Sequence, residues 1–379
     1  MSEPVNDAAE PVLLFEHATA SGHVLAEARL NSEATLNSLS LPMIEILAPA
    51  LGRWAGDDRV VGVLLTGAGD RAFSAGGDIQ ALYNAMVRNH AAGEVVDDYP
   101  FRFFEAEYRL DYRIHCYPKP VVSLGHGVVM GGGLGVFSGA RHRLVTEKSR
   151  IAMPEVTIGL FPDAGGTWLL RNMPRHIATF VGVTGAQMNG ADALEVGLAT
   201  QGIPAAERPR VLETLLAADW RGDPGVDDER MQAALAALPA AEMPPVEVGA
   251  VPRSLEPEGG AAAVAEQVRG LVGTSDWIDG GIAALNRGCP TSVGIIAEQL
   301  RRAPALALAD CFRLEMIVAS HCARHPDFAE GVRALIVDKD NAPRWQYPNV
   351  EALPEWYVAE HFTPPWPNNP LDDLEEQTS

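Results

Sequence analysis

The sequence predicts an α/β fold that is followed by a mainly helical C-terminal region. From residue 12 to about 205, short apolar runs of strand character alternate with segments of helical spacing, as in α/β domains. From Arg208 onward, apolar residues recur almost entirely at helical spacing. The expected organisation is an α/β core over 10–206, a helical region over 207–366 with a linker at about 238–259, and an acidic tail over 367–379. We expect this tail to be frayed and solvated.

The first elements follow from alternation and apolar runs. Residues 12–16 and 23–30 alternate as two strands joined by a turn at Ser21-Gly22. Residues 38–54 have helical spacing, with Ser40 as the expected cap ahead of Pro42. The run VVGVLLT at 60–66 is nearly all apolar, as in a strand that is buried on both faces. A turn at 73–78 and a helix at 79–87 are expected to follow.

The middle of the chain continues this alternation. Residues 88–100 are polar and predict a loop, and 101–116 form an amphipathic pattern that Pro118 ends. On that helix, Glu107 taken alone predicts a solvated face. A strand at 121–124 follows, and the remaining expected elements are two short helices within 165–185, a helix and then a strand within 191–204, and C-terminal helices at 261–272, 277–286, 291–302 and 306–323.

Composition narrows the function classes. The 379 residues are 47% hydrophobic and 21% charged, as in a globular protein, and no apolar run is long enough to span a bilayer. The net charge of −21 argues against nucleic-acid or anionic-membrane partners. The opening MSEPVNDAAEP lacks the character of a signal or transit peptide, so we expect a cytoplasmic location.

Two weaker patterns, a dinucleotide fingerprint and a possible metal site, have better structural interpretations. The segment GAGDRA after strand 60–66 fits a loose dinucleotide fingerprint, but the required helix does not begin there. The four cysteines show no CxxC spacing, which favours reduced thiols. His321, Cys322 and His325 could be metal ligands, but the end of a helix before Pro326 is the better interpretation, so no metal is expected.

The residues that can carry chemistry concentrate between Gly125 and Gly166. The glycines of 131–133 follow strand 121–124 and precede the small-residue segment 134–140. A strand that runs through glycines into a helix leaves backbone N–H groups pointing at one spot, which a ligand atom can approach closely. Further along, Glu155 and Asp163 stand in apolar settings. An anion-stabilising hole and two carboxylates suggest chemistry on a carbonyl.

Several motifs resemble those of the crotonase superfamily of coenzyme A thioester enzymes. They are AFSAGGDI at 72–79, KPVVSLGHGVVMGGG at 119–133 and AMPEVTIGLFPDAGGT at 152–167. With EGVRALIVDKDNAPRW at 330–345, the chain is most similar to the 3-hydroxyisobutyryl-CoA hydrolase subfamily, over roughly residues 10–350. The segment after Leu30 lacks the basic residue and proline that superfamily members often carry. The resemblance implies a spiral of repeated ββα units, closed by a helical C-terminal region.

The resemblance also implies roles for individual residues. The backbone N–H groups of Gly77 and Gly132 would form an oxyanion hole for the thioester oxygen. Glu155 would be the nucleophile or general base, and Asp163 would orient water or hold the substrate's 3-hydroxyl. Further substrate contacts are implied for Glu107, Asp78 and Lys339, the last with a CoA phosphate. No metal or redox cofactor is implied, because CoA enters as part of the acyl-CoA substrate.

The acidic residues decide which reaction is expected. Enoyl-CoA hydratases of the superfamily use two glutamates; here the first position is Gly135, and the second is retained as Glu155. Hydratases carry glycine where this chain has Asp163. We therefore expect hydrolysis of a short 3-hydroxyacyl-CoA, with an enoyl-CoA hydratase or isomerase second and a CoA-binding protein without turnover third. The sequence leaves the exact acyl chain and a homo-oligomer open.

Overall fold

The computed structural model describes residues 3–374, which divide into two compact units. Unit 1 comprises the residues up to Gly77, Leu110–Ile151 and Met188–Val246. Unit 2 comprises Asp78–Arg109, Ala152–Gln187 and the residues from Glu247 onward. The chain passes between the units several times, whereas the sequence predicted one division between residues 206 and 207. The last passage, after Val246, lies inside the segment that was predicted as a linker.

Unit 1 contains two sheets. The six-stranded sheet has the order β1-β2-β3-β5-β7-β10, and the four-stranded sheet has the order β4-β6-β8-β9. Within the larger sheet, β1 and β2 are antiparallel and all later neighbours are parallel. The strands are β1 Val12–Ala18, β2 Val24–Leu30, β3 Val60–Gly67, β4 Ala72–Ser74, β5 Val121–Gly125, β6 Val128–Met130, β7 His142–Val145, β8 Arg150–Ala152, β9 Met188–Asn189 and β10 Gln201–Gly202.

The strands follow a repeating path. Three successive strand pairs, β3–β4, β5–β6 and β7–β8, each place their first strand in the larger sheet and their second in the smaller one. The first strands are parallel to one another, β5 to β3 and β7 to β5. Helices follow the pairs, so the chain winds forward as a series of ββα units. The predicted fold class, an α/β spiral with a helical C-terminal region, is confirmed.

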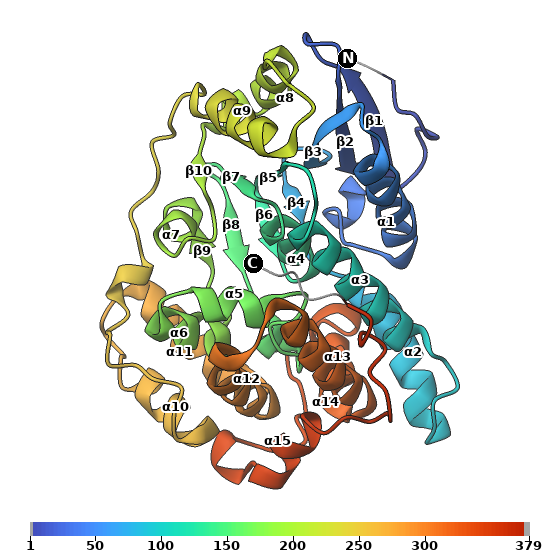
Figure 1. Cartoon of the computed structure of the whole chain (residues 1–379). Helices are drawn as coiled ribbons and strands as arrows, with labels where there is room; N and C mark the ends of the chain where they lie inside the picture. The colour runs from blue at the N-terminus through green and yellow to red at the C-terminus, as the bar shows by residue number, and fades with distance from the viewer. Residues whose placement is uncertain (1–2, 375–379) are drawn as a thin grey trace. The chain divides into compact units, whose positions relative to one another are not determined.

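The helices of unit 1 bury one face of the larger sheet. Apolar residues of β3, β5 and β7 pack against those of α8 and α9 around Trp220, which is 1% exposed. Figure 1 shows α8 and α9 beside these strands. In α9, Met231 fits over Gly62 of β3, where a Cβ would lie 2.9 Å from the methionine methyl carbon. The helices of unit 1 are α1 Leu41–Gly56, α4 Gly132–Ser138, α7 Gly190–Glu195, α8 Arg208–Ala217 and α9 Pro224–Ala236.

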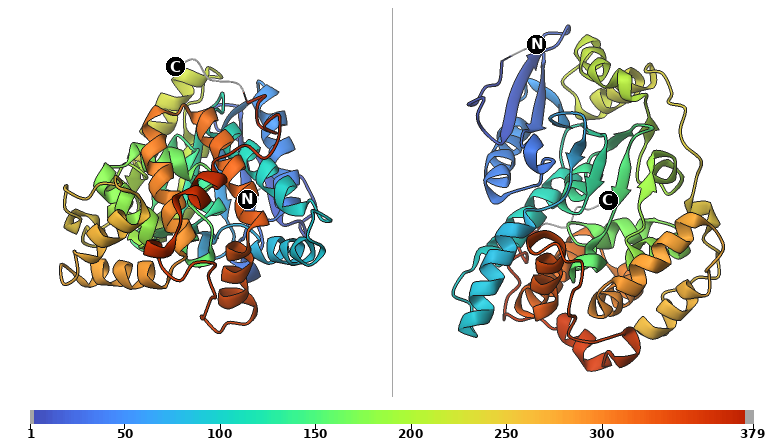
Figure 2. Two further views of the ribbon diagram at one scale, coloured as in Figure 1. Left: turned by 90° about the horizontal axis from the view of Figure 1, so that it is seen from below. Right: turned by 180° about the vertical axis from the view of Figure 1, so that it is seen from behind.

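Unit 2 is helical throughout its C-terminal part. Figure 2 shows these helices in orange and red, gathered together without an intervening strand in the described part of the chain. None of the described helices is both long and apolar enough to cross a membrane. The helices are α2 Ile79–Ala92, α3 Tyr99–His115 (which continues into unit 1), α5 Gly166–Asn172, α6 Arg175–Thr184, α10 Gly260–Arg269, α11 Asp276–Arg287, α12 Pro290–Arg302, α13 Leu308–Arg324, α14 Pro326–Val332 and α15 Glu355–His361.

Several local predictions were wrong in detail. Ser40 precedes α1 as expected, but its side chain makes no capping hydrogen bond. The turn predicted at 73–78 begins with the short strand β4, which pairs with β6, and α2 continues to Ala92 instead of ending at 87. The difference arises because strand pairing and tertiary packing extend elements beyond their local signals.

The expected frayed tail is wrong for residues 367–374. Leu371 is fully buried, and Arg109 of α3 donates a hydrogen bond of 2.6 Å to the carbonyl of Pro370. From α13, Arg313 donates another of 2.6 Å to the carbonyl of Leu374. The acidic composition suggested a solvated tail, but two arginines and one leucine hold this segment within unit 2. Residues 375–379 lie outside the described residues.

Candidate active site

The two expected oxyanion donors belong to neighbouring strand ends in unit 1. Gly77 follows β4, and Gly132 follows β6, which pairs with β4 in parallel. Gly76 adopts φ +115°, and a Cβ placed there would lie 3.5 Å from the carbonyl oxygen of Met130. The carboxyl ends of adjacent parallel strands thus bring the two glycine segments together. Whether their N–H groups bind a substrate oxygen stays a prediction.

Each of the three successive glycines at 131–133 has a different structural role. Gly131 adopts φ +48°, a left-handed conformation that glycine tolerates, and it directly precedes α4. At Gly133 a Cβ would lie 2.5 Å from the side chain of Ser74, so β4 and α4 pack too closely for any other residue. Gly132 is the first residue of α4, and an N–H in a first helical turn has no partner within its helix.

Unit 2 holds the acidic residues, and two of them are almost fully buried. Glu155 begins the short 3₁₀ helix Glu155–Ile158 and is 4% exposed. Glu107 on α3 is 2% exposed, so the solvated helix face that its local pattern suggested is not what the structure contains. Among the described residues, Oε2 of Glu155 and Oε1 of Glu107 have no hydrogen-bond partner. Unpartnered buried carboxyl oxygens are costly and typical of sites that bind a further group.

Asp163 is the third carboxyl of this unit, and a tyrosine holds it. The hydroxyl of Tyr108, the residue after Glu107 on α3, donates a hydrogen bond of 2.7 Å to Oδ2 of Asp163. The Tyr108 side chain is fully buried. Asp163 is partly buried and lies just before α5, in the turn that ends at Gly166. Its Oδ2 atom therefore has a fixed neighbour inside unit 2.

The carboxyl groups perturb one another. Burial, together with the carboxyls of Asp163, Glu315 and Glu155, raises the pKa of Glu107 well above its usual range. Burial and the Asp163 carboxyl raise the pKa of Glu155 in the same way. Burial raises the pKa of Asp163 from 3.8 to about 6, while the Tyr108 hydrogen bond lowers it. Raised carboxyl pKa values of this kind suit groups that act as acids and bases in catalysis.

Asp78 and Lys339 are the other residues expected to contact the substrate. Asp78 is the N-cap of α2, and its Oδ1 atom accepts a hydrogen bond of 3.1 Å from the Ala81 N–H. This capping role is compatible with a substrate contact but does not test it. Lys339 is exposed and adopts φ +56°, in the loop after the π-helix Arg333–Val337.

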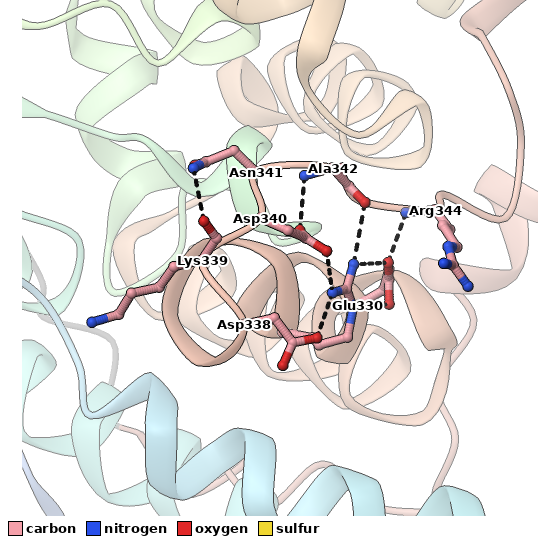
Figure 3. Close-up of polar contacts among 8 residues, drawn as sticks. Glu330, Asp338, Lys339, Asp340, Asn341, Ala342 and Arg344 are labelled. Carbon is pink, nitrogen blue, oxygen red and sulfur yellow. Dashed lines mark hydrogen bonds and ion pairs between the residues drawn. The ribbon is translucent and has the colours of Figure 1, made fainter.

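Arg333 explains much of the C-terminal motif around Lys339. Its guanidinium donates to the carboxylates of Glu330, Asp338 and Asp340 at 2.6–2.9 Å. The Arg344 N–H also donates to Glu330, at 2.7 Å. Figure 3 shows the Lys339 side chain pointing away from these contacts. The motif therefore builds an arginine-centred loop, and a CoA phosphate contact by Lys339 stays a prediction.

The histidine pair considered as a metal site has other partners. Cys322 is buried, and burial raises its pKa well above the usual range of a thiol. His321 bonds through Nε2 to the carbonyl of Thr363 at 2.8 Å, and Nε2 of His325 lies 3.9 Å from Oε2 of Glu360. The ligand atoms of His321, His325 and Glu360 lie within 4.8 Å of one another, and Cys322 is not a member of this group.

The sequence analysis missed three residues of this region. Tyr108 bonds to Asp163, and Glu315 and Gln299 bond to the turn that carries Asp163. A glutamate at position 315, within the apolar face of an amphipathic helix, was the one available signal. Neither Tyr108 nor Gln299 carries a local signal that distinguishes it from an ordinary helical residue.

Comparisons with known proteins agree on the family. The family model described as enoyl-CoA hydratase/isomerase matches residues 25–362. The mitochondrial 3-hydroxyisobutyryl-CoA hydrolase of Gallus gallus is 32% identical over 355 residues, covering 88% of this chain and 85% of that protein. The protein of the same name from Danio rerio is 33% identical, covering 93% of this chain and 89% of that protein.

Two solved structures resemble the chain over nearly its whole length. A carnitinyl-CoA dehydratase from Mycobacterium thermoresistibile has a TM-score of 0.82 at 31% identity, covering 96% of this chain and 99% of that chain. An enoyl-CoA hydratase from Rhodobacter sphaeroides has a TM-score of 0.79 at 32% identity, covering 93% of this chain and 97% of that chain. With a model match over most of its length and relatives above 30% identity, the chain belongs to the enoyl-CoA hydratase/isomerase family, the crotonase family.

Proposed function

We propose that the chain hydrolyses the thioester bond of 3-hydroxyisobutyryl-CoA, releasing 3-hydroxyisobutyrate and CoA as in valine breakdown. The hydrolase names of relatives at 30–33% identity support this activity. The observation that carries it here is the pairing of Glu155 with Asp163 in one cluster of carboxyls, while Gly135 in α4 offers no side chain. A thioesterase needs water directed at the thioester carbon, and this set of groups suits that task.

The proposed reaction assigns one role to each group. The Glu155 carboxylate accepts a proton from water as the water oxygen attacks the thioester carbon, and Asp163 orients this water. Charge on the thioester oxygen is stabilised by the N–H groups of Gly77 and Gly132, in an oxyanion hole of the kind where one donor contributes about 3–4 kcal/mol. The C–S bond then breaks, and CoA leaves as a thiolate that takes up a proton. An attack by Glu155 itself, followed by hydrolysis of an anhydride, gives the same products.

The pKa shifts suggest how the two carboxyls share the work. Burial raises the pKa of Asp163 to about 6, and the hydrogen bond that Tyr108 donates to its Oδ2 atom limits this rise. Asp163 is therefore mostly ionised at neutral pH, whereas burial and the Asp163 carboxyl raise the pKa of Glu155 well above its usual range. Glu107, whose pKa burial also raises, is suited to form a hydrogen bond with the substrate's 3-hydroxyl.

An enoyl-CoA hydratase is the second candidate, and one observation favours it. Hydration needs two acid–base groups, and Gly135 removes one of those used by hydratases. The Glu155 carboxyl contributes to the raised pKa of the buried Glu107, so a second carboxyl lies near Glu155. The titles of the two similar structures name a dehydratase and a hydratase. Glu107 does not stand at position 135, where hydratases carry their first glutamate, so the hydrolase stays the first candidate and the parallel assay decides between the two.

The test of the hydrolase proposal is release of free thiol from a panel of acyl-CoA esters. We expect 3-hydroxyisobutyryl-CoA to be cleaved faster than isobutyryl-CoA, which differs only in lacking the 3-hydroxyl. Glu155→Gln provides the matched protein control. Absence of thiol from every ester on the panel would refute a thioesterase, and equal rates for the two esters would refute the assigned contact with the 3-hydroxyl.

The proposal needs no metal or redox cofactor, because the substrate itself supplies the CoA moiety. The acyl-CoA is the only partner that it requires, and a homo-oligomer remains open. A cytoplasmic location stays a prediction from the sequence; the animal relatives are described as mitochondrial, so location is to be measured by fractionation of the native host.

A further inference from the structure

The turn that carries Asp163 is held in an unusual conformation. Ala164 adopts φ +52° and Gly165 adopts φ +85°, so two successive residues are left-handed. A side chain in this region is disfavoured, because its Cβ approaches the following carbonyl. The conformation therefore needs support from outside the turn.

Two buried polar residues of the C-terminal helices supply this support. From α13, Glu315 accepts hydrogen bonds of 2.8 Å from the N–H groups of both Gly165 and Thr167. From α12, Gln299 donates to the carbonyl of Pro162 at 2.6 Å and to Oγ1 of Thr167 at 2.7 Å. Glu315 is fully buried and Gln299 is 1% exposed. These four hydrogen bonds hold the turn on both sides of Asp163, from Pro162 to Thr167 in α5.

A buried glutamate is a costly way to satisfy two N–H groups. Burial raises the pKa of Glu315 to about 8, and the nearby carboxyl of Asp163 adds to the shift. Serine or asparagine next to a helix start satisfies the same groups without burying a charge. Costly features of this kind persist where they fix a functional geometry. Both carboxylate oxygens of Glu315 are already occupied, so it is poorly placed to act as a base itself.

We propose that Glu315 and Gln299 are positioning residues, which hold the turn at 162–167 so that the Asp163 carboxyl keeps its place beside the Tyr108 hydroxyl. This inference rests on the proposed function, because Asp163 is assigned its role there. It gives the C-terminal helices α12 and α13 a part in the reaction although neither residue is assigned a substrate contact.

The test compares Glu315→Gln and Gln299→Met with the parent and with the control Asp310→Asn. Glutamine keeps one acceptor but turns an NH₂ group toward the second N–H. Methionine keeps the length of Gln299 and removes both donors. Asp310 lies on the same helix as Glu315, but its side chain is 41% exposed and pairs with Arg313. Folding is checked by circular dichroism and thermal unfolding, and thiol release gives kcat and KM.

We expect kcat to fall by about 10–100-fold in both variants, with KM within about three-fold of the parent, because the bound substrate then meets a misplaced carboxyl. Parental kcat in a folded Glu315→Gln overturns the role of Glu315. If that variant does not fold, Gln299→Met decides in the same way. A fall in kcat that Asp310→Asn shares equally would also refute the inference.

A pH profile separates positioning from general packing. The charged and titratable groups that interact with Glu315 are Asp163, Glu107, Tyr108 and Cys311. Ionised Glu315 accepts both N–H bonds best, so kcat of the parent should rise as pH passes about 8. Glu315→Gln should lose this rise and keep the one near pH 6 that belongs to Asp163. An unchanged profile overturns the inference. If the parent releases no thiol, the proposed function fails, and the same comparison is made on crotonyl-CoA hydration.

Discussion

Replacing Asp163 by asparagine should stabilise the protein while it abolishes turnover. Burial raises the pKa of this carboxyl from 3.8 to about 6, a change of about two pH units. At about 1.4 kcal/mol per unit, the ionised carboxylate costs the folded state about 3 kcal/mol above pH 6. Asparagine carries no charge, and its Oδ1 atom can still accept the Tyr108 hydroxyl, so most of this cost should disappear.

The sign of the pH dependence follows from the raised pKa. A carboxyl whose folded-state pKa exceeds its unfolded value favours folding most below the unfolded pKa, and this contribution is lost as pH rises to the folded pKa. The increase in the free energy of unfolding that Asp163→Asn brings should therefore be small near pH 4 and grow up to pH 6. It should then stay at about 3 kcal/mol from pH 6 to pH 8. Urea unfolding at a series of pH values measures the difference directly.

The matched control is Asp310→Asn on α13, where the side chain is 41% exposed and pairs with Arg313. Its effect on the free energy of unfolding should stay within about 0.5 kcal/mol. The reasoning is refuted if Asp163→Asn is no more stable than the parent at pH 8, or if its advantage is the same at pH 4 and pH 8. In either case the Asp163 carboxyl would not be electrostatically strained.

The remaining predictions concern catalysis. Glu155→Gln should fold and lose at least about 10²–10⁴-fold in thiol release, because an amide is neither a base nor a nucleophile; near-parental turnover would remove Glu155 from the mechanism. Tyr108→Phe deletes the bond that lowers the pKa of Asp163, so the acid limb of kcat/KM should move to higher pH, and an unmoved limb would contradict the assignment. Gly132→Pro removes an N–H at the first position of α4, where proline is tolerated, and should lose more activity than Gly132→Ala; equal losses in folded variants would exclude an oxyanion role.

Local patterns predicted the parts of the fold that depend on neighbours in sequence. The nearly all-apolar run at 60–66 became β3, buried almost throughout, and the glycine run at 131–133 became the N-cap and the first two residues of α4. Motif resemblance identified Glu155 and Asp163, and the structure puts both among carboxyls with raised pKa values. Periodicity alone would have placed Glu107 in solvent, because which side of α3 is covered depends on helices far along the chain.

The contacts that the sequence could not predict join distant segments. Tyr108 and Asp163 are 55 residues apart, and Glu315 lies 150 residues beyond Gly165. Pairing over such distances leaves no trace in helical or strand periodicity, because each residue fits its own segment equally well without its distant partner. The same reason explains the segment 367–374, whose composition suggested a tail while Arg109 and Arg313 bind its carbonyls.

The most direct test of the account follows two signals in parallel with the purified parent. Thiol release is measured with 3-hydroxyisobutyryl-CoA, and loss of the enoyl absorbance is measured with crotonyl-CoA. The account predicts rapid release of CoA from the first ester and hydration of the second that is slower by several orders of magnitude, because Gly135 carries no acid–base group. Rapid hydration of crotonyl-CoA without any thiol from 3-hydroxyisobutyryl-CoA would contradict the hydrolase assignment and leave the hydratase in its place.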